Sequence, residues 1–377
     1  MNYIVFDLEW NQSPNGKEDS VEHLPFEIIE IGAVKLNGNF EETGTFHKLI
    51  RPKVYKKMHF KISEVTHMDM AELRQAGEPF DVVMNRFLAW CGEEEFRFCT
   101  WGSMDLTELQ RNMAYHKLPN PFPRPLLYLD IQKLYCLQYG DGKNKVSLDM
   151  AVQLQGMEEE RPFHRALDDA YYTGRILSVM DMETFGIYVS VDYYGLPRNK
   201  AEEYRLHFPE YSKYVSREFD SREDILKDKD ITDMKCVKCS RMLRKKLRWF
   251  PYGQRFYFCL AVCPEHGYVK GKIRVKKSED DRFYAVKTAK MADEQDVELL
   301  AQKKEDGRKK RSAKAHHKAA SKSLKGKASR ISRIRCHKIK RSKYLTTVSR
   351  SLKFERPGDF CLITQGSSRW SVPPAFP

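Results

Sequence analysis

Two carboxylic acids at alternate positions near the start of the chain form the first group of residues that could take part in a reaction. Asp7 and Glu9 end an apolar run that begins at Tyr3, and its β-branched and aromatic residues are typical of a buried strand. Because successive side chains of a strand point to opposite faces, both acids are expected on one face. Like charges held that close are stable only when they are protonated, solvated or bound to a cation. The pair indicates a cation site, and the alternative is an exposed strand end with two solvated acids.

Three more polar residues fall at comparable places farther along the chain. Residues 164–177 have the apolar spacing of a helix, and His164 and Asp169 bracket its first turns. Residues 96–106 predict a strand, a glycine turn and the start of a helix that holds Asp105. Four acids and one histidine are therefore expected at strand ends or in first helical turns.

Together these stretches form three motifs that resemble those of the DnaQ-like 3′-to-5′ exonucleases of the DEDDh type. They are Phe-Asp-Leu-Glu, an acid at the start of a middle helix, and His-x-Ala-x-x-Asp-Ala, in that order along the first half of the chain. The family has its last acid five residues after the histidine and just before an alanine, so Asp169 matches rather than Asp168. The resemblance implies that the active-site residues are Asp7, Glu9, Asp105, His164 and Asp169.

A finer resemblance lies in the segment that follows the first motif. Phe-Glu-Ile-Ile-Glu-Ile-Gly-Ala-Val, from Phe26, is most similar to a branch of RNA-processing exonucleases that includes KapD-like sporulation inhibitors. Many family members have Thr-Gly-Ile at the place where this chain has Thr66-His67-Met68.

The resemblance also implies a mechanism that uses two Mg²⁺ or Mn²⁺ ions about 4 Å apart. Hard cations prefer carboxylate oxygens, which suits a site made of four acids. Asp7 is expected to bridge both ions, and Glu9 and Asp169 to complete the site that holds the attacking water. Asp105 is expected to hold the second ion, and His164 to accept the proton of the attacking water.

The elements that must position these residues alternate between strands and helices. Such an alternation predicts a mixed sheet with helices on both faces, an α/β domain of the RNase H-like type, over residues 1–190. The predicted strands cover residues 3–10, 26–36, 43–50, 96–101 and 126–130, and the predicted helices cover 80–90, 103–116, 131–139, 147–155 and 164–182.

A second group of possible metal ligands lies in the second half of the chain. A Cys-x-x-Cys pair is followed by a Cys-x-x-His pair, and thiolate and imidazole ligands at this spacing favour a tetrahedral Zn²⁺ site. The predicted ligands of one structural Zn²⁺ are Cys236, Cys239, Cys263 and His266. We expect a small zinc-ribbon-like β module over residues 233–288, with Cys259 in its core. The alternative is a set of unconnected free cysteines.

Basic and aromatic residues surround these cysteines, a combination that suits phosphate contacts and base stacking. The candidate nucleic-acid contacts are Arg248, Trp249, Lys270, Lys272 and Arg274, together with Trp10 beside the first motif. Two alternatives stay open: the ribbon could merely brace the catalytic domain, and Trp10 could be a core residue.

Composition and charge set limits on the rest of the molecule. The 377 residues carry a net charge of +14, which favours a polyanionic partner. Residues 191–232 are expected to be a charged helical connector, and residues 289–377 a basic low-complexity tail that is largely disordered. No apolar run approaches the length of a membrane span, so we expect no membrane partner. Scattered cysteines, nine in number, are typical of a reducing cytoplasm.

These observations predict a metal-dependent 3′-to-5′ exonuclease that acts on single-stranded nucleic acid, with RNA favoured over DNA. One alternative is a DNA exonuclease of the proofreading or repair type. The other is a regulator without enzymatic activity that binds nucleic acid through the ribbon and the tail.

Overall fold

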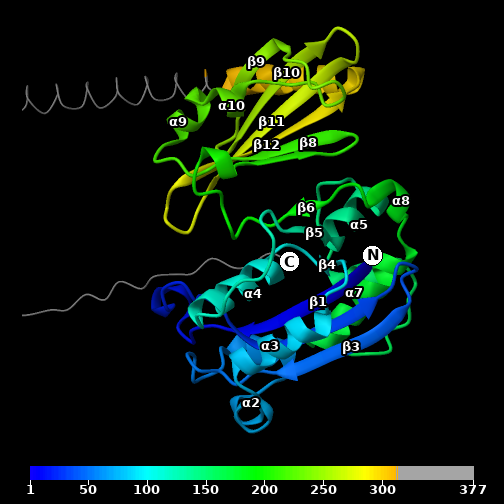
Figure 1. The fold of residues 1–377 in the computed structure, drawn as a ribbon, viewed down its shortest axis with the longest axis vertical. Helices are drawn as coiled ribbons and strands as arrows, with labels where there is room; N and C mark the ends of the chain where they lie inside the picture. Colours follow the sequence, from blue (N-terminus) through cyan, green and yellow to red (C-terminus); the bar gives the residue numbers. More distant parts are fainter. Residues whose placement is uncertain (311, 313–377) are drawn as a thin grey trace, which may run out of the picture. The chain divides into compact units, whose positions relative to one another are not determined.

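The computed structural model describes residues 1–310 and 312, so most of the predicted basic tail lies outside the described residues. Residues 1–307 form one compact unit, which contains two six-stranded sheets (Figure 1).

The first sheet is built around the strand that carries Asp7 and Glu9. This strand, β1, pairs in antiparallel fashion with β2 on one side and in parallel fashion with β4 on the other. The order is β3-β2-β1-β4-β5-β6, so β1 lies in the interior of the sheet, in agreement with the buried strand that its apolar run predicted. The strands are β1 (Asn2–Asn11), β2 (Glu27–Leu36), β3 (Glu42–Leu49), β4 (Phe96–Thr100), β5 (Leu127–Asp130) and β6 (Ser190–Val191).

Helices cover both faces of this sheet, which confirms the predicted α/β class with a mixed sheet. They are α1 (Phe60–Thr66), α2 (Met70–Ala76), α3 (Phe80–Cys91), α4 (Met104–Tyr115), α5 (Ile131–Tyr139), α6 (Leu148–Leu154), α7 (Ala166–Val179) and α8 (Met182–Phe185).

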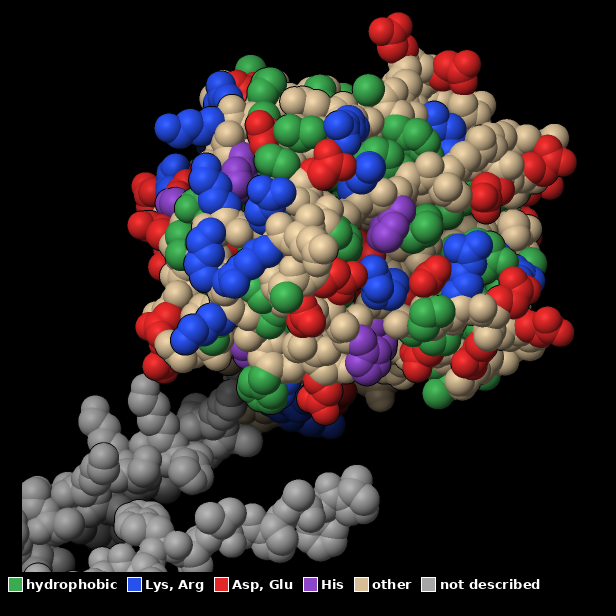
Figure 2. Space-filling view, turned by 90° about the horizontal axis from the view of Figure 1, so that it is seen from below, with side chains coloured by type: hydrophobic (Ala, Val, Ile, Leu, Met, Phe, Trp, Pro, Cys, Tyr) green, Lys and Arg blue, Asp and Glu red, His purple; other side chains and the backbone are tan. Residues whose placement is uncertain are grey.

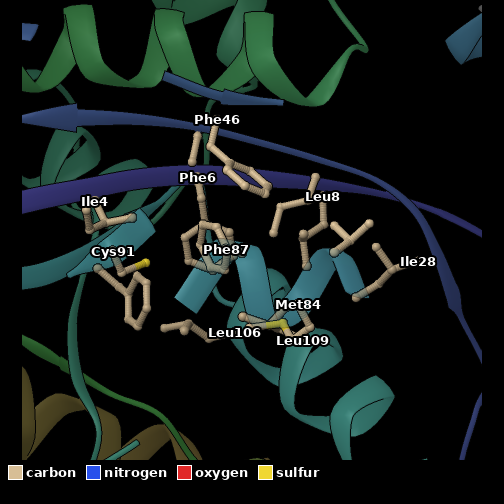
Figure 3. Packing of buried hydrophobic residues seen from close by; sticks show 14 of the residues in the cluster. Ile4, Phe6, Leu8, Ile28, Phe46, Met84, Phe87, Cys91, Leu106 and Leu109 are labelled. Carbon is tan, nitrogen blue, oxygen red and sulfur yellow. The ribbon is translucent and has the colours of Figure 1, made fainter. Parts of the chain in front are cut away.

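The alternation of side chains along β1 separates the core from the acids. Ile4, Phe6 and Leu8 point toward α3 and α4, where they pack against residues such as Phe87 and Leu109 (Figure 3). Val5 belongs to the other cluster, which contains residues of α5, α6 and α7. Asp7 and Glu9 have the same parity as Val5, so they lie on the α7 face of the sheet.

The second sheet is larger than the ribbon that the cysteine spacing predicted. All its strands are antiparallel, in the order β7-β8-β12-β11-β10-β9. They are β7 (Tyr204–His207), β8 (Tyr211–Val215), β9 (Arg244–Tyr252), β10 (Phe256–Cys263), β11 (Gly267–Lys277) and β12 (Phe283–Ala292).

The predicted helical connector over residues 191–232 is therefore only partly helical. α9 (Arg222–Lys227) and α10 (Lys229–Thr232) are helices, but β7 and β8 are strands of the second sheet. The charged composition of this segment did not indicate strands. β8 pairs with β12, which lies about seventy residues later in the chain, so this pairing is not visible in the local sequence.

The predicted tail also begins later than expected. β12 extends to Ala292, and a helix follows over residues 294–310. Leu300 of this helix is buried against Phe250 and Leu260 of the second sheet. This apolar contact holds the start of the predicted tail on the sheet.

The charge of the chain is unevenly divided between its described and undescribed parts. Residues 1–310 carry 49 basic and 50 acidic side chains, whereas residues 311–377 carry 17 and 2. On the face drawn in Figure 2, side chains of both signs are interspersed, and a group of Lys and Arg gathers along one side. The excess positive charge of the whole chain therefore belongs to residues beyond 310. Within the described ranges, we find no helix with the length and apolarity needed to cross a bilayer.

Candidate active site

Three of the five predicted active-site residues come together at the end of β1. Asp7, Glu9 and Asp169 each offer a carboxylate oxygen, and these oxygens lie within 4.8 Å of one another. Asp105, buried in the first turn of α4, lies outside this group of three but close enough for its charge to raise the pKa of Asp7. Asp105 accepts a hydrogen bond from the backbone N–H of Leu8. Leu8 lies beyond Val5, the last residue of β1 that pairs with β4.

A glycine allows α7 to approach the sheet closely enough to place Asp169 beside Asp7. Asp7 pairs with Gly32 across the β1–β2 ladder. A Cβ atom on Gly32 would lie 2.0 Å from the backbone nitrogen of Leu167 and 2.2 Å from the carbonyl carbon of Ala166. Any side chain at position 32 would therefore displace the first turn of α7 from β2.

A buried ion pair that the sequence analysis did not identify anchors the same turn. Glu30 is fully buried and accepts hydrogen bonds from Arg165 (Nη2, 2.9 Å) and from the backbone nitrogen of Ala166 (3.2 Å). Its Oε1 also lies 2.6 Å from Nε2 of His47. Burial favours protonation, but the bonds from His47 and Arg165 outweigh it and lower the pKa of Glu30. An acid within a strand of Ile, Gly, Ala and Val was the available signal, because a charge there needs a partner.

The four acids at the end of β1 have pKa values above their usual range. Burial raises the pKa of Asp7 well above that range, and the charges of Asp105, Asp169 and Glu9 add to the effect. Burial, followed by repulsion from Asp169, raises the pKa of Glu9 to about 9. The pKa values of Asp105 and Asp169 rise to about 7, mainly through burial. Buried acids that repel one another in this way suit a divalent cation, which would neutralise them.

The first prediction follows for protein without a divalent cation. A carboxyl whose pKa is higher in the folded chain stabilises the fold below its unfolded pKa and loses that contribution as the pH rises through the folded pKa. We expect the melting temperature of EDTA-treated protein to fall from pH 5 to pH 9, and added Mn²⁺ to reverse most of the fall at high pH. If Mn²⁺ removes about 2 kcal/mol of repulsion among the acids, the melting temperature should rise by roughly 4–8 °C.

Asp7→Asn is the matched variant for this measurement, because it removes one charge and keeps the shape of the side chain. Its melting temperature in EDTA should depend less on pH, and Mn²⁺ should have little effect on it. Identical pH profiles for wild type and Asp7→Asn would contradict the pKa assignments.

His164 lies just before α7, in a left-handed backbone conformation. It is exposed, its φ is +68°, and its backbone N–H donates to Oδ1 of Asp169 at 3.2 Å. The neighbouring Asp168 lies 3.4 Å from Nη1 of Arg161 instead. The structure thus brings Asp169, and not Asp168, to the acids of β1, as the motif predicted.

The departure from Thr-Gly-Ile has a structural counterpart. His67 is the C-cap of α1 and has a φ of +56°, in the left-handed region that glycine adopts without strain. The backbone conformation expected of the family's glycine is therefore present here on a histidine.

The predicted zinc ligands also come together. Cys236, Cys239, Cys263 and His266 each place one ligand atom within 4.8 Å of the others. The Sγ atoms of Cys239 and Cys263 are 3.8 Å apart, and Nδ1 of His266 is 3.7 Å from Sγ of Cys236 and 3.6 Å from Sγ of Cys263. Tetrahedral zinc with Zn–S of about 2.3 Å and Zn–N of about 2.05 Å requires roughly 3.8 Å between sulfurs and 3.5 Å between sulfur and nitrogen. Cys259 lies outside this group and is buried in the core, as predicted.

The predicted nucleic-acid contacts divide into two sets. Trp10 packs against the first core cluster, and Trp249 is part of the second-sheet core and donates from Nε1 to the carbonyl of Thr232. Lys270 forms an ion pair with Asp296 at 2.5 Å. These three are engaged within the protein, so we do not retain them as contacts. Arg248 is exposed on β9, and Lys272 and Arg274 line a cavity described below.

Part of the chain is similar to a known protein family. Residues 4–177 match the model of a family described as exonuclease (RNase T). No curated protein matches the chain. The chain therefore contains an exonuclease domain, and it is an enzyme of the hydrolase class.

Three solved structures are among those to which the chain is similar. The nuclease domain of 3′hExo, a DEDDh family member bound to rAMP, is 21% identical, with 51% of this chain and 96% of that chain covered and a TM-score of 0.42. A 3′-exonuclease solved for recognition of a histone mRNA stem-loop is 20% identical, with 52% and 92% covered and a TM-score of 0.42. E. coli exonuclease I in complex with a dA16 oligonucleotide is 13% identical, with 69% and 54% covered and a TM-score of 0.42.

Proposed function

We propose that this protein is a metal-dependent exonuclease that removes nucleotides from the 3′ end of single strands, with RNA preferred over DNA. The observation that carries the proposal is the meeting of Asp7, Glu9 and Asp169 at the end of β1, inside the domain that matches the exonuclease family. The preference for RNA rests on the likeness of residues 26–34 to the RNA-processing, KapD-like branch.

The chain's own residues have separate roles in this proposal. Asp7, Glu9 and Asp169 would hold one Mg²⁺ or Mn²⁺ ion, and Asp105 would take part in holding a second. When bound, such ions activate water and neutralise charge on the phosphate. The His164 imidazole accepts the proton of the attacking water. Water adds to phosphorus while the bond to the 3′ oxygen of the preceding nucleotide breaks, which releases a nucleoside 5′-monophosphate.

Glu30 and Arg165 are positioning residues in this scheme. Their ion pair fixes the first turn of α7, which carries Asp169, against β2. Gly32 provides the space for this contact. The side chains that bind the ions are therefore held by packing and by a buried ion pair before any ion is present.

The direction and the sugar preference can be tested with matched strands. RNA and DNA of one sequence are labelled at the 5′ end and incubated with Mg²⁺, and a second set carries a blocked 3′ end. We expect a ladder of products shortened from the 3′ end, formed faster from RNA, and no products from the blocked strands. A faster reaction on DNA would favour the repair-type alternative. Cleavage of blocked strands would contradict an exonuclease that starts from 3′ ends.

We also propose that one structural Zn²⁺ is held by Cys236, Cys239, Cys263 and His266. The spacing of the four ligand atoms supports this, as does the chemistry of one thiolate. Although burial opposes ionisation, backbone N–H groups of Glu265 and His266 lower the pKa of Cys263 to about 6. The ion would link the segment just before β9 to the end of β10.

The second prediction concerns Cys239→Ser, which removes one ligand. The variant should lose its zinc on dialysis, whereas the wild type should keep one per chain. Because the second sheet also has apolar clusters away from the zinc ligands, we expect local opening around residues 235–243 rather than unfolding of the whole sheet. Elemental analysis and limited proteolysis measure the two effects.

Cys259→Ala is the matched control for this experiment, since Cys259 is a buried cysteine outside the ligand group. It should retain one zinc per chain. Well-folded wild type without zinc would refute the site.

A cytoplasmic location is the last part of the proposal. The seven cysteines that the described residues contain are all free. Free thiols and thiolate ligands persist in a reducing compartment.

A further inference from the structure

A large cavity lies between the exonuclease domain and the second sheet. Its volume is about 1120 Å³, and its walls come from α4 and the β5–β6 region on one side and from β8, β11 and β12 on the other. Around it the two sheets share an apolar cluster in which Val191 packs with Val215 and Tyr284. Arg111 of α4 also forms an ion pair with Glu279, beyond β11. The cavity therefore has walls that direct contacts hold together, and we call it the cleft.

The cleft is lined by basic side chains that the strand register places side by side. Lys272 of β11 pairs with Thr288 of β12, which pairs with Lys213 of β8, so these three side chains form a row across one face of the sheet. Arg274 and Lys276 follow at alternate positions of β11, on the same face. Ten Lys and Arg residues line the cleft against five Asp and Glu. This ratio contrasts with the even balance of charges over residues 1–310.

Several of these basic groups form no ion pair with an acid in the described part of the chain. Among residues 1–310, Lys133, Lys213, Lys272, Arg274 and Lys276 form no salt bridge. Three acids of the cleft already have partners: Glu279 pairs with Arg111, which also lines the cleft, Glu218 pairs with Arg282, and Asp192 accepts from Gln110 at 2.9 Å.

The energetic cost of this arrangement appears in the lysine pKa values. Burial, reinforced by the charge of Lys133, lowers the pKa of Lys213 to about 7. Burial lowers the pKa values of Lys133 and Lys276 to about 8. Buried cations without counter-ions are unfavourable, and an anion in the cleft would stabilise them.

The cleft reaches the helix turn that carries Asp105. Ser103 and Thr107, which flank Asp105 on α4, line the cleft, and so does Asp130. The charge of Asp130 contributes to the raised pKa of Asp105, so the two acids are close. An extended ligand in the cleft would therefore have one end beside the predicted catalytic acids.

Tyrosine rings complete the lining. Tyr193 and Tyr194 are half-buried on the wall from the β6 side, and Nζ of Lys276 lies 4.1 Å from the ring centroid of Tyr193. Basic grooves with exposed rings bind single strands, through phosphate charge and through stacking of bases. The volume also exceeds the roughly 300–1,000 Å³ of a pocket for one small molecule.

We propose that the cleft binds the single strand upstream of its 3′ end, so that the second sheet is the surface that holds several nucleotides behind the catalytic acids. This inference rests on the proposed function. It assigns substrate binding to Lys213, Lys272, Arg274 and Lys276, and it makes single strands longer than a few nucleotides the preferred substrates. Phosphodiester backbones of RNA and DNA share the recognised chemistry, and the experiment compares them.

The test measures binding without hydrolysis. Full-length protein carrying Asp7→Asn is titrated in EDTA with fluorescent 12-nucleotide RNA and DNA, and the same background then carries Lys272→Gln with Arg274→Gln. We expect the double substitution to weaken binding ten- to a hundredfold. The slope of log K against log salt should become shallower by about 1.4, because single strands contribute about 0.7 for each phosphate contact.

The control removes the same charge from a part of the second sheet and its helices that lies outside the cleft. Lys229→Gln with Arg244→Gln changes two exposed basic residues that do not line the cleft, and it should leave both affinity and slope unchanged. Equal affinity for the cleft and control variants would overturn the proposal. A mononucleotide or inorganic phosphate that binds as tightly as the 12-mer would overturn it in favour of a small-anion site. Because binding is scored separately from turnover, an inactive wild type would refute the proposed function without deciding the cleft.

Discussion

We expect Asp7→Asn to abolish hydrolysis, with a rate loss of at least about 10³, and to leave the fold intact. The amide keeps the shape of the side chain but has no negative charge with which it would help to hold a cation. Electrostatic stabilisation by bound ions contributes several kcal/mol to phosphodiester cleavage, and each 1.36 kcal/mol corresponds to a factor of ten. Single-turnover release of the 3′ nucleotide measures the loss.

The stability of the same variant separates a loss of chemistry from a loss of structure. Asp7 lies among acids that raise one another's pKa values, so removal of its charge should raise the melting temperature in EDTA near pH 8. Asp168→Asn is the matched control, because Asp168 is adjacent to Asp169 in sequence but contacts Arg161. It should retain nearly full activity. Turnover near the wild-type level in Asp7→Asn would refute the metal-site assignment.

We expect His164→Gly to lower the hydrolysis rate by roughly 10²–10⁴, the usual contribution of a general base. The substitution removes the imidazole and leaves all four acids in place. Since His164 has a φ of +68°, glycine fits the backbone without strain and the fold should be at least as stable. Single-turnover rates of the variant and the wild type under one buffer condition measure the loss.

Two further measurements decide whether His164 acts on the proton. Added imidazole should restore part of the rate in His164→Gly, and calorimetry should show Mn²⁺ affinity close to that of the wild type. His164→Asn serves as a second control, because asparagine also tolerates the left-handed conformation. Loss of Mn²⁺ binding in both variants would make His164 a ligand and contradict its assignment as the base.

The catalytic half of the chain could be predicted well from local patterns. The period-two run of β1 placed both acids on one face, and three motifs in order indicated which residues should meet them. The local patterns could not reveal the contacts that hold these acids together. Glu30 stands out as an acid in an apolar strand, but its partner Arg165 is distant in the sequence, so local patterns could not identify the pair. The tight contact of Gly32 with α7 likewise exists only in three dimensions.

The second half was predicted less completely for the same reason. Cysteine spacing indicated which four residues come together because both pairs are local, whereas the sheet around them depends on the pairing of β8 with β12. Basic and aromatic composition suggested a binding surface but not which side chains are free. Trp249 turned out to be part of the core, while Lys213, in the supposed connector, lines the cleft.

The most direct test of the central claim is the release of the 3′-terminal nucleotide by protein that has been dialysed against EDTA. We predict no release until Mg²⁺ or Mn²⁺ is added, and then stepwise shortening of a 5′-labelled single strand, while the Asp7→Asn protein stays inactive at every cation concentration. Steady hydrolysis in EDTA, or no hydrolysis of any strand by well-folded protein with Mn²⁺, would contradict the assignment of Asp7, Glu9, Asp105 and Asp169 as the catalytic metal ligands.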